Sequence, residues 1–328
     1  METGKNSEEI SVSIICNTFQ HEKYIAEALD SFLKQKTNFN FEILVHDDAS
    51  TDRTADIIRQ YAERYPDKIF PVIQAENQYS KGILISKEFQ YPRARGKYFA
   101  LCEGDDFWID ENKLQRQFDY MQTHPECTLC ISNAQVRSPE GKIIGELSLT
   151  KVDRIIPPEE VMLGGGFCAT NSIFSYSELM RNQPDYFNIL SIDLVIQMYL
   201  ASCGTTFCFA DQMVVYRKGV EGSWCTRMRN STEKRIQHWE KCIAVRRAFD
   251  EATGGKYHTT VEEICNNLQF RIKWMQGDFA GLCASEFQHP YQKLSKKEKI
   301  RFQMEKHCQK IYRIANRSWL RVREYIKK

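Results

Sequence analysis

The sequence contains no long apolar run. No stretch approaches the roughly 18 consecutive apolar residues that a membrane-spanning helix needs, and the first ten residues, METGKNSEEI, hold no apolar core of a signal peptide. Both absences argue against a membrane-spanning or an exported protein. We therefore expect a cytoplasmic location.

The sequence also offers little evidence of disulfides or of a zinc site. Most of its twelve cysteines lie inside apolar patterns, where a thiol packs as a small hydrophobic group, as at Cys16, Cys102 and Cys208. The one suggestive spacing is Cys127-Thr128-Leu129-Cys130, and a single C-x-x-C pair is a weak zinc signal. Because alternate residues of a strand face opposite sides of a sheet, ordinary packing is the favoured interpretation.

The composition is otherwise that of a soluble globular protein. The 328 residues are 42% hydrophobic and 27% charged, with a formal net charge of +2. The charge is uneven, because residues 291–328 hold thirteen Lys and Arg against three Glu, a net charge of +10, which leaves −8 on the rest of the chain. This basic tail favours peripheral contact with an anionic membrane surface, and a solvated helix face is the simpler alternative.

Short β-branched runs alternate with helical periodicity from Val12 to about Arg137, which predicts βαβ units and a mainly parallel sheet. The expected strands are residues 12–16, 41–47, 69–74, 97–102, 128–136, 169–174 and 206–217. The expected helices are residues 24–35, 54–64, 113–123 and 192–203, with a hairpin or connection at 138–150.

Beyond Trp224 the pattern is helical almost throughout. One apolar stripe in the basic tail consists of Ile300, Met304, Cys308, Ile311, Ala315, Trp319, Val322 and Ile326. Such a stripe packs on its own protein or on a second copy more often than on lipid, although aromatic residues among cations are also typical of an interfacial helix.

Ligands of a doubly wound sheet bind at the carboxyl ends of its strands, so the residues after each expected strand are candidates for a site. The first strand is followed by Asn17-Thr18-Phe19-Gln20-His21, which lacks glycine. A dinucleotide-binding loop needs glycines for its turn and for close approach to a pyrophosphate, and a P-loop is missing as well. A bound nucleotide would need another group to neutralise its phosphates.

Three acids follow the second strand in His46-Asp47-Asp48-Ala49-Ser50-Thr51-Asp52. Ser50 and Asp52 are expected to cap the next helix, but capping does not account for both Asp47 and Asp48. The Asp48 carboxylate is able to accept the N3–H of a pyrimidine, on whose ring Phe19 would stack.

The fourth strand is followed by CEGDDFWID, residues 102–110. Gly104 permits a tight reversal that directs the carboxylates of Glu103, Asp105 and Asp106 toward one point. Carboxylates without His or Cys nearby make a hard oxygen site suited to Mg²⁺ or Mn²⁺, which would neutralise the phosphates that no glycine loop holds. The alternative is an acidic turn without a ligand.

The chain resembles the family-2 inverting glycosyltransferases, which have the GT-A nucleotide-diphospho-sugar transferase fold. The matching segments are SVSIICNTFQHEKYIAEALDSFL, EILVHDDASTDRT, ARGKYFALCEGDDFWID with KLQRQFDYM, SIDLVIQMYLASCG and VVYRKGVEGSW. The resemblance implies an α/β fold with a mostly parallel central sheet flanked by helices, followed by an all-helical C-terminal region. The implied domains are a GT-A-like glycosyltransferase domain at residues 1–228 and a helical region with a basic amphipathic tail at 229–328.

The resemblance also implies roles for single residues. Asp193 would be the catalytic base, and Asp106, with Asp105, would hold the metal. The implied donor-binding residues are Asn17, Phe19, Asp48, Glu103 and Asp105.

Two positions depart from the family pattern. Glu103 stands where the motif usually has Asp, and Gly219 stands where many members have a His that helps to hold the metal or the diphosphate. Arg217 and Trp224 are therefore expected to serve the donor or the acceptor, and Trp108 is a candidate wall for the sugar.

The resemblance implies a metal-dependent inverting glycosyltransferase that moves a sugar from a nucleotide-sugar donor, with UDP as the expected nucleotide, to a glycan or lipid-linked saccharide, as in bacterial-type surface polysaccharide synthesis. Mg²⁺ or Mn²⁺ would stabilise the leaving diphosphate, and a carboxylate would take the proton of the acceptor hydroxyl. No nucleic-acid partner is expected.

Two alternatives remain open. A nucleotidyltransferase that forms sugar nucleotides would carry a glycine-rich basic loop, which residues 17–21 do not provide. A non-catalytic subunit that binds nucleotide-sugar or membrane would not need the acids that the chain retains at Asp48, Asp105, Asp106 and Asp193.

Overall fold

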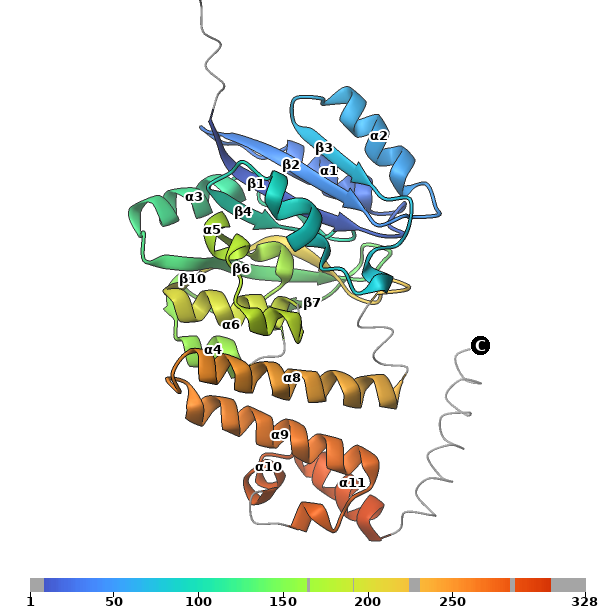
Figure 1. Cartoon of the computed structure of the whole chain (residues 1–328), viewed down its shortest axis with the longest axis vertical. Helices are drawn as coiled ribbons and strands as arrows, with labels where there is room; N and C mark the ends of the chain where they lie inside the picture. The colour runs from blue at the N-terminus through green and yellow to red at the C-terminus, as the bar shows by residue number, and fades with distance from the viewer. Residues whose placement is uncertain (1–8, 164–165, 191, 224–230, 284–286, 308–328) are drawn as a thin grey trace, which may run out of the picture. The chain divides into compact units, whose positions relative to one another are not determined.

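A computed structural model describes residues 9–163, 166–190, 192–223, 231–283 and 287–307 of the chain (Figure 1). The chain divides into two compact units, Met1–Arg227 and Met228–Lys328. None of the helices in the described part of the chain combines the length and the hydrophobicity of a membrane span.

The first unit is built on one mixed sheet, in which the strands follow the order β3-β2-β1-β4-β9-β6-β10-β5. β1 is parallel to β2 and β4, β2 is parallel to β3, and β6 is parallel to β10. β5, β7, β8 and β9 pair antiparallel with their neighbours. The bounds are β1 Ile10–Thr18, β2 Asn40–Asp47, β3 Ile69–Ile73, β4 Tyr98–Leu101, β5 Phe107–Trp108, β6 Cys127–Arg137, β7 Ile143–Leu147, β8 Arg154–Ile156, β9 Phe174–Tyr176 and β10 Thr205–Arg217.

Helices cover both faces of this sheet. α1 (Ile25–Leu33), α2 (Thr54–Arg64) and α3 (Lys113–Thr123) contribute to one core cluster, and α4 (Pro158–Leu163), α5 (Ser177–Arg181) and α6 (Asp193–Cys203) contribute to the other. The predicted bounds of α2 and α3 are confirmed. The short helical segments are η1 Tyr79–Lys81, η2 Ser86–Gln90, η3 Tyr91–Arg93, η4 Thr170–Ser172 and η5 Asp185–Asn188.

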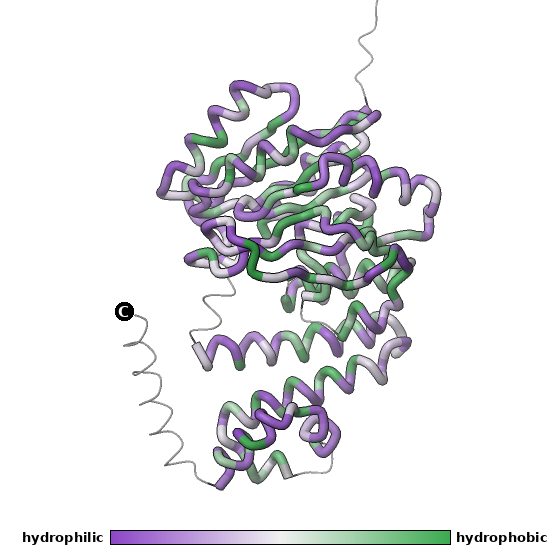
Figure 2. Tube along the Cα trace, turned by 180° about the vertical axis from the view of Figure 1, so that it is seen from behind, coloured by the Kyte–Doolittle hydropathy of each residue, from purple (hydrophilic) through white to green (hydrophobic). Residues whose placement is uncertain are grey.

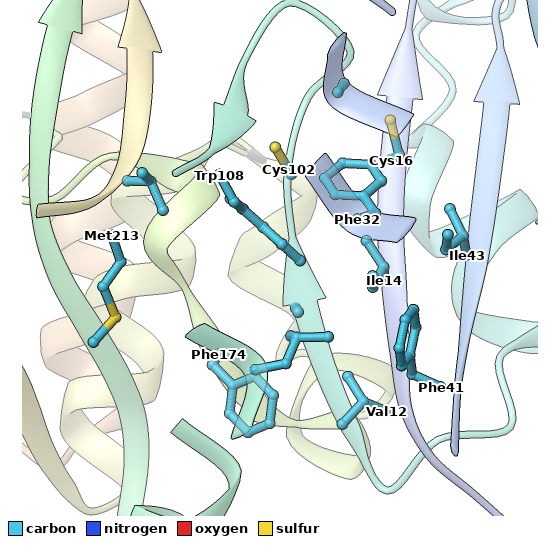
Figure 3. Packing of buried hydrophobic residues seen from close by; sticks show 14 of the residues in the cluster. Val12, Ile14, Cys16, Phe32, Phe41, Ile43, Cys102, Trp108, Phe174 and Met213 are labelled. Carbon is cyan, nitrogen blue, oxygen red and sulfur yellow. The ribbon is translucent and has the colours of Figure 1, made fainter. Parts of the chain in front are cut away.

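The central strands are buried on both faces, so successive residues of one strand enter different clusters. In β1, Ile14 packs under α1 and Ile15 packs on the opposite face. Figure 3 shows Ile14, Phe32 and Trp108 among the side chains of the first cluster. Figure 2 shows that hydrophobic segments gather along the strands in the middle of this unit.

Two local predictions are wrong. The strand expected at residues 169–174 begins only at Phe174, because Ser172 Oγ donates to the Ala169 carbonyl and Asn171 Nδ2 donates to the Val215 carbonyl around a 3-10 turn. The thiols of Cys127 and Cys130 were expected on opposite faces but lie in the same core cluster. Thr205 of β10 pairs with Cys127, but the next residue, Thr206, pairs with Leu129, so β6 has an irregularity between the two cysteines. Such an irregularity increases the local twist of a strand.

The second unit is helical in its described part, as predicted. Its helices are α8 (Thr232–Ala252), α9 (His258–Gln276), α10 (Gln288–Gln292) and α11 (Lys296–His307), with the short segment η6 (Gly281–Cys283). Phe270, Phe287, Leu294 and Phe302 form a separate hydrophobic core in this unit.

Candidate active site

The carboxyl ends of β1, β2 and β4 meet at one edge of the sheet, and hydrogen bonds join the loops that follow them. The Asp48 N–H donates to the Thr18 carbonyl at 3.0 Å, and the Gly104 N–H donates to the Asn17 carbonyl at 2.9 Å. The loops predicted to form a site are therefore neighbours.

The acidic turn, residues 103–106, depends on the missing side chain of Gly104. A Cβ at this position would lie 2.7 Å from the Thr18 Cβ and 3.1 Å from His21 Nδ1. Glycine thus permits the turn to approach the loop after β1. Within the turn Glu103 is exposed, Asp105 is half-buried and Asp106 is buried.

Arg217, the last residue of β10, binds the acidic turn through hydrogen bonds. Its backbone N–H donates to Asp106 Oδ1 at 2.7 Å, and its Nη1 donates to the Asp105 carbonyl at 2.5 Å. Nη2 is paired with the Glu27 carboxylate of α1, and the guanidinium lies 4.6 Å from the centre of the Phe107 ring. Arg217 is buried, so the expectation that it serves the donor or the acceptor is wrong, and it positions the carboxylates instead.

Sequence reasoning missed this arrangement and a second neighbour of the turn. His21 Nε2 lies 3.8 Å from Asp105 Oδ2, and His21 Nδ1 is a buried atom without a hydrogen-bond partner. The available signals were the position of His21 directly after the first strand and the Tyr-Arg pair at the end of the last strand.

The carboxylates of the acidic turn repel one another. The pKa of Glu103 is raised to about 8, because protein atoms displace water around its carboxyl and because Asp105 and Asp193 lie close. Glu103 is exposed as a residue, so solvent weakens the effect of burial, and repulsion by the two aspartates is the main cause of the raised pKa. The pKa of Asp106 is also raised, first by burial and then by Asp105 and Glu103, while the Arg217 N–H opposes the shift.

Asp193 begins α6, and its negative charge contributes to the raised pKa of Glu103 in the acidic turn. Its Oδ1 accepts the Leu194 N–H at 2.8 Å, and its Oδ2 would lie 3.4 Å from a Cβ built on Gly166. Burial raises the pKa of Asp193, and the Leu194 N–H partly offsets this. A raised pKa makes the Asp193 carboxylate a stronger proton acceptor.

Two of the residues predicted to bind the base, Asp48 and Asn17, make hydrogen bonds to other protein groups. Asp48 is buried, and its two carboxylate oxygens accept the N–H groups of Gln78 at 2.8 Å and Tyr79 at 3.0 Å. Asn17 Nδ2 donates to Ser86 Oγ at 2.8 Å. Phe19 is 43% exposed, so its ring is accessible to a ligand.

Asp47, the neighbouring acid, shapes the loop. Its two carboxylate oxygens accept the Ser50 Oγ–H at 2.5 Å and the Ser50 N–H at 3.0 Å. The N-cap of α2 is Arg53, which makes no side-chain cap hydrogen bond, so the expectation that Ser50 and Asp52 cap this helix is wrong. Asp52 instead accepts the N–H of Thr54, the first residue of α2. A structural role therefore accounts for Asp47.

The expectation that Trp108 forms a wall for the sugar is wrong. Trp108 is only 4% exposed, its ring lies 4.7 Å from that of Phe32, and its Nε1 donates to the Asn171 carbonyl at 2.9 Å. Trp224 lies outside the described residues. Gly219 has φ +95°, a conformation that L side chains rarely adopt, so a histidine at this position would be strained.

The oxygen ligands that the site offers suit a divalent cation that takes most of its other ligands from phosphate and water. Over the described residues, no group of three or more His, Cys, Asp or Glu side chains is arranged to hold a metal ion. The site instead offers Asp105 and Asp106, whose mutual repulsion a cation would relieve. Hard oxygen ligands of this kind fit Mg²⁺ or Mn²⁺ completed by phosphate and water.

Comparison with known proteins identifies relatives of the first unit. Residues 13–172 match the family model described as Glycosyl transferase family 2. An uncharacterised protein of Mycobacterium tuberculosis is 36% identical over 217 residues, which cover 65% of this chain and 60% of the relative. The chain thus spans 60% of the length of that curated relative. The UDP-Glc:alpha-D-GlcNAc-diphosphoundecaprenol beta-1,3-glucosyltransferase WfaP of Escherichia coli is 33% identical over 112 residues, 34% of this chain and 41% of the relative.

Solved structures share the fold. The S. aureus TarS 1-349 complex with UDP-GlcNAc superposes with a TM-score of 0.59 at 16% identity and covers 89% of this chain and 78% of TarS 1-349. The mannosyltransferase PcManGT of Pyrobaculum calidifontis, in complex with GDP-Man and Mn²⁺, has a TM-score of 0.51 at 14% identity, with 93% and 92% of the two chains covered. These likenesses confirm the GT-A-type α/β fold.

Proposed function

The chain carries a glycosyl transferase family 2 domain, and from this premise we propose that it transfers a sugar, with inversion, from a nucleotide-sugar donor to an acceptor hydroxyl. The observation that carries the proposal is that hydrogen bonds join the acidic turn to the loop after β1, and that loop to the loop after β2, at the carboxyl ends of the strands. Asp193 is near enough to raise the pKa of Glu103. One carboxylate can then serve as the base while others face the diphosphate.

The donor is proposed to be a UDP-sugar and the acceptor a glycan or lipid-linked saccharide, as in bacterial-type surface polysaccharide synthesis. The fold shared with TarS, whose structure contains UDP-GlcNAc, supports a UDP-sugar donor. The name of WfaP, a glucosyltransferase of a diphosphoundecaprenol-linked sugar, supports a lipid-linked acceptor. A lipid-linked acceptor would place the protein in the cytoplasm at the inner face of a membrane.

Asp106 and Asp105 would hold Mg²⁺ or Mn²⁺, and Glu103 is proposed to contact the donor beside them. The Mn²⁺ in the PcManGT structure supports such a cation. When bound, it supplies Lewis-acid stabilisation of the charge on the departing diphosphate. Arg217 keeps the two aspartates in place through the Asp106 carboxylate and the Asp105 carbonyl.

Asp193 is the proposed general base. Its Oδ1 is held by the Leu194 N–H, which leaves Oδ2 to accept the acceptor's proton. As the acceptor oxygen bonds to the anomeric carbon, the bond from that carbon to the diphosphate oxygen breaks, and the proton passes to Asp193. Phe19, Asn17 and Asp48 are proposed to bind the nucleoside, with the Phe19 ring as a stacking surface.

Turnover assays of carboxylate variants test this function. We expect Asp193→Asn to lower the rate of sugar transfer about 10²–10⁴-fold while the UDP-sugar still binds, because it removes only the base. Asp106→Asn should lower both transfer and donor hydrolysis. Release of nucleoside diphosphate from UDP-, GDP- and dTDP-sugars, with Mn²⁺ present, is the measurement.

Asp67→Asn, an exposed carboxylate between α2 and β3, is the matched control and should leave turnover unchanged. Equal turnover by Asp106→Asn and the unsubstituted protein would reject the proposal. Release of pyrophosphate from UTP and a sugar 1-phosphate, without release of nucleoside diphosphate from the sugar nucleotides, would identify a nucleotidyltransferase. Donor binding without any turnover would identify a non-catalytic subunit.

A further inference from the structure

Helix α11 is anchored to the second unit by one side only. Phe302 is buried, and its ring centre lies 5.8 Å from that of Phe270 and 5.2 Å from that of Trp274. The helix start is fixed by a reciprocal cap, in which the Glu298 N–H donates to Ser295 Oγ and the Ser295 N–H donates to the Glu298 carboxylate. The helix is thus a firmly placed element of this unit.

The opposite side of α11 carries large apolar side chains in solvent. Ile300 is 63% exposed and Met304 is 50% exposed. Residues four apart lie one above the other on a helix, so these two side chains form one apolar strip. Phe302, between them in sequence, points to the core.

Cations flank this strip and acids do not. Lys296 and Lys297 are exposed and lie one turn before Ile300, one on each side of the strip. The two acids of α11 are engaged toward the body of the unit: Glu298 is bonded to Ser295, and Glu305 accepts Trp274 Nε1–H at 2.5 Å and pairs with Arg301. The α11 outer face, defined as Lys296, Lys297, Ile300 and Met304, is therefore apolar and positive.

We propose that the α11 outer face docks on the surface of an anionic lipid bilayer. Aliphatic side chains would enter the boundary between head groups and acyl chains, and the lysines would contact anionic head groups. A second copy of this chain is a poorer partner, because its identical face is also positive and offers no acid to pair with the lysines. The stripe predicted from sequence continues at 308–328, outside the described residues, and the inference rests on α11 alone.

Vesicle co-sedimentation of the full chain tests the proposal. We expect binding to vesicles of phosphatidylcholine mixed with phosphatidylglycerol, and much weaker binding to pure phosphatidylcholine. Ile300→Ser/Met304→Ser and Lys296→Gln/Lys297→Gln should each lower the partition coefficient on the order of tenfold, because each pair supplies one part of the attraction. High salt should remove the effect of the lysine pair and spare that of the apolar pair.

The matched control is Ile143→Ser/Ile144→Ser on β7, whose side chains are 58% and 50% exposed in the first unit, and it should bind like the unsubstituted chain. Circular dichroism and donor hydrolysis without vesicles report whether each variant is folded, so a failure of docking is distinguishable from a failure of the proposed transferase activity. The proposal is overturned if the unsubstituted chain ignores anionic vesicles, if the Ile300/Met304 variant binds them equally well, or if that variant converts a dimer to a monomer in light scattering.

Discussion

At the scale of the residue, the acidic turn is held by contacts that come from far along the chain. Arg217 is separated from Asp106 by 111 positions, yet its N–H and guanidinium bind the turn. Its planar group reaches Asp105, Glu27 and the Phe107 ring at once. A lysine keeps the charge but has one nitrogen, so it cannot make these contacts together.

Arg217→Lys is therefore expected to lower the kcat/KM of donor turnover on the order of tenfold to a hundredfold, because small displacements of catalytic carboxylates are costly. The Mn²⁺ concentration for half-maximal activity should rise, which a purely structural role would not cause. Titration of activity with Mn²⁺ is the measurement. Arg154→Lys, in the more exposed ion pair with Glu160, is the control, and an equal response of the two variants would contradict a positioning role.

At the scale of the element, α3 begins with a lysine that has no access to solvent. Lys113 is fully buried, its Nζ donates to Gln117 Oε1 at 2.8 Å, and it lies 4.1 Å from the Trp108 ring centre. Burial lowers its pKa from 10.5 to about 7. An amphipathic helix normally places a lysine outside, so α3 carries a cost to stability at neutral pH.

The sign of the pH dependence follows from this shift. Between the folded pKa of about 7 and the ordinary 10.5, the unfolded chain binds more protons, so Lys113 makes the free energy of unfolding rise with pH. The contribution reaches at most about 1.4 kcal/mol per pH unit. Lys113→Met should be more stable than the unsubstituted protein near pH 7, and the difference should shrink toward pH 10.

Urea unfolding at several pH values measures this difference. Lys34→Met, at an exposed position after α1, should show no such trend. A Lys113→Met variant whose advantage does not change with pH would show that the ammonium is not desolvated as described.

At the scale of the whole molecule, the two compact units have separate cores. Phe174 is buried in the sheet of the first unit, and Phe302 is buried in the helical core of the second. We propose that the division at residues 227 and 228 is one of function as well as of packing, with donor chemistry confined to the first unit.

Phe302→Ala and Phe174→Ala form a matched pair for this proposal. Each should lower the stability of its own unit by about 3–5 kcal/mol, through lost burial and a cavity. The Phe302→Ala variant should keep donor hydrolysis at low temperature. On heating, the Phe174→Ala variant should lose donor hydrolysis at a lower temperature than the Phe302→Ala variant. Calorimetry and hydrolysis rates measured over the same temperatures check both, and equal thermal loss of hydrolysis would contradict separate units.

Local sequence patterns were enough to predict many of the elements and the edge of the sheet where the candidate site lies. Alternating apolar runs predicted β1 to β4, and helical periodicity predicted α2 and α3 to the residue, because both patterns are local. The acids after β2 and β4 marked the site for the same reason, since each follows its own strand directly.

The contacts that the side chains of those elements make could be read only from the folded chain. In the folded chain Trp108 is buried and Ile300 is exposed to solvent. Arg217, which was expected to contact a ligand, instead forms a hydrogen bond with the acidic turn. Folding also brought Asp193 close to Glu103, 90 positions earlier in the chain. Periodicity records which face of an element is apolar, whereas these contacts join residues far apart in sequence, and only the packed chain specifies such pairs.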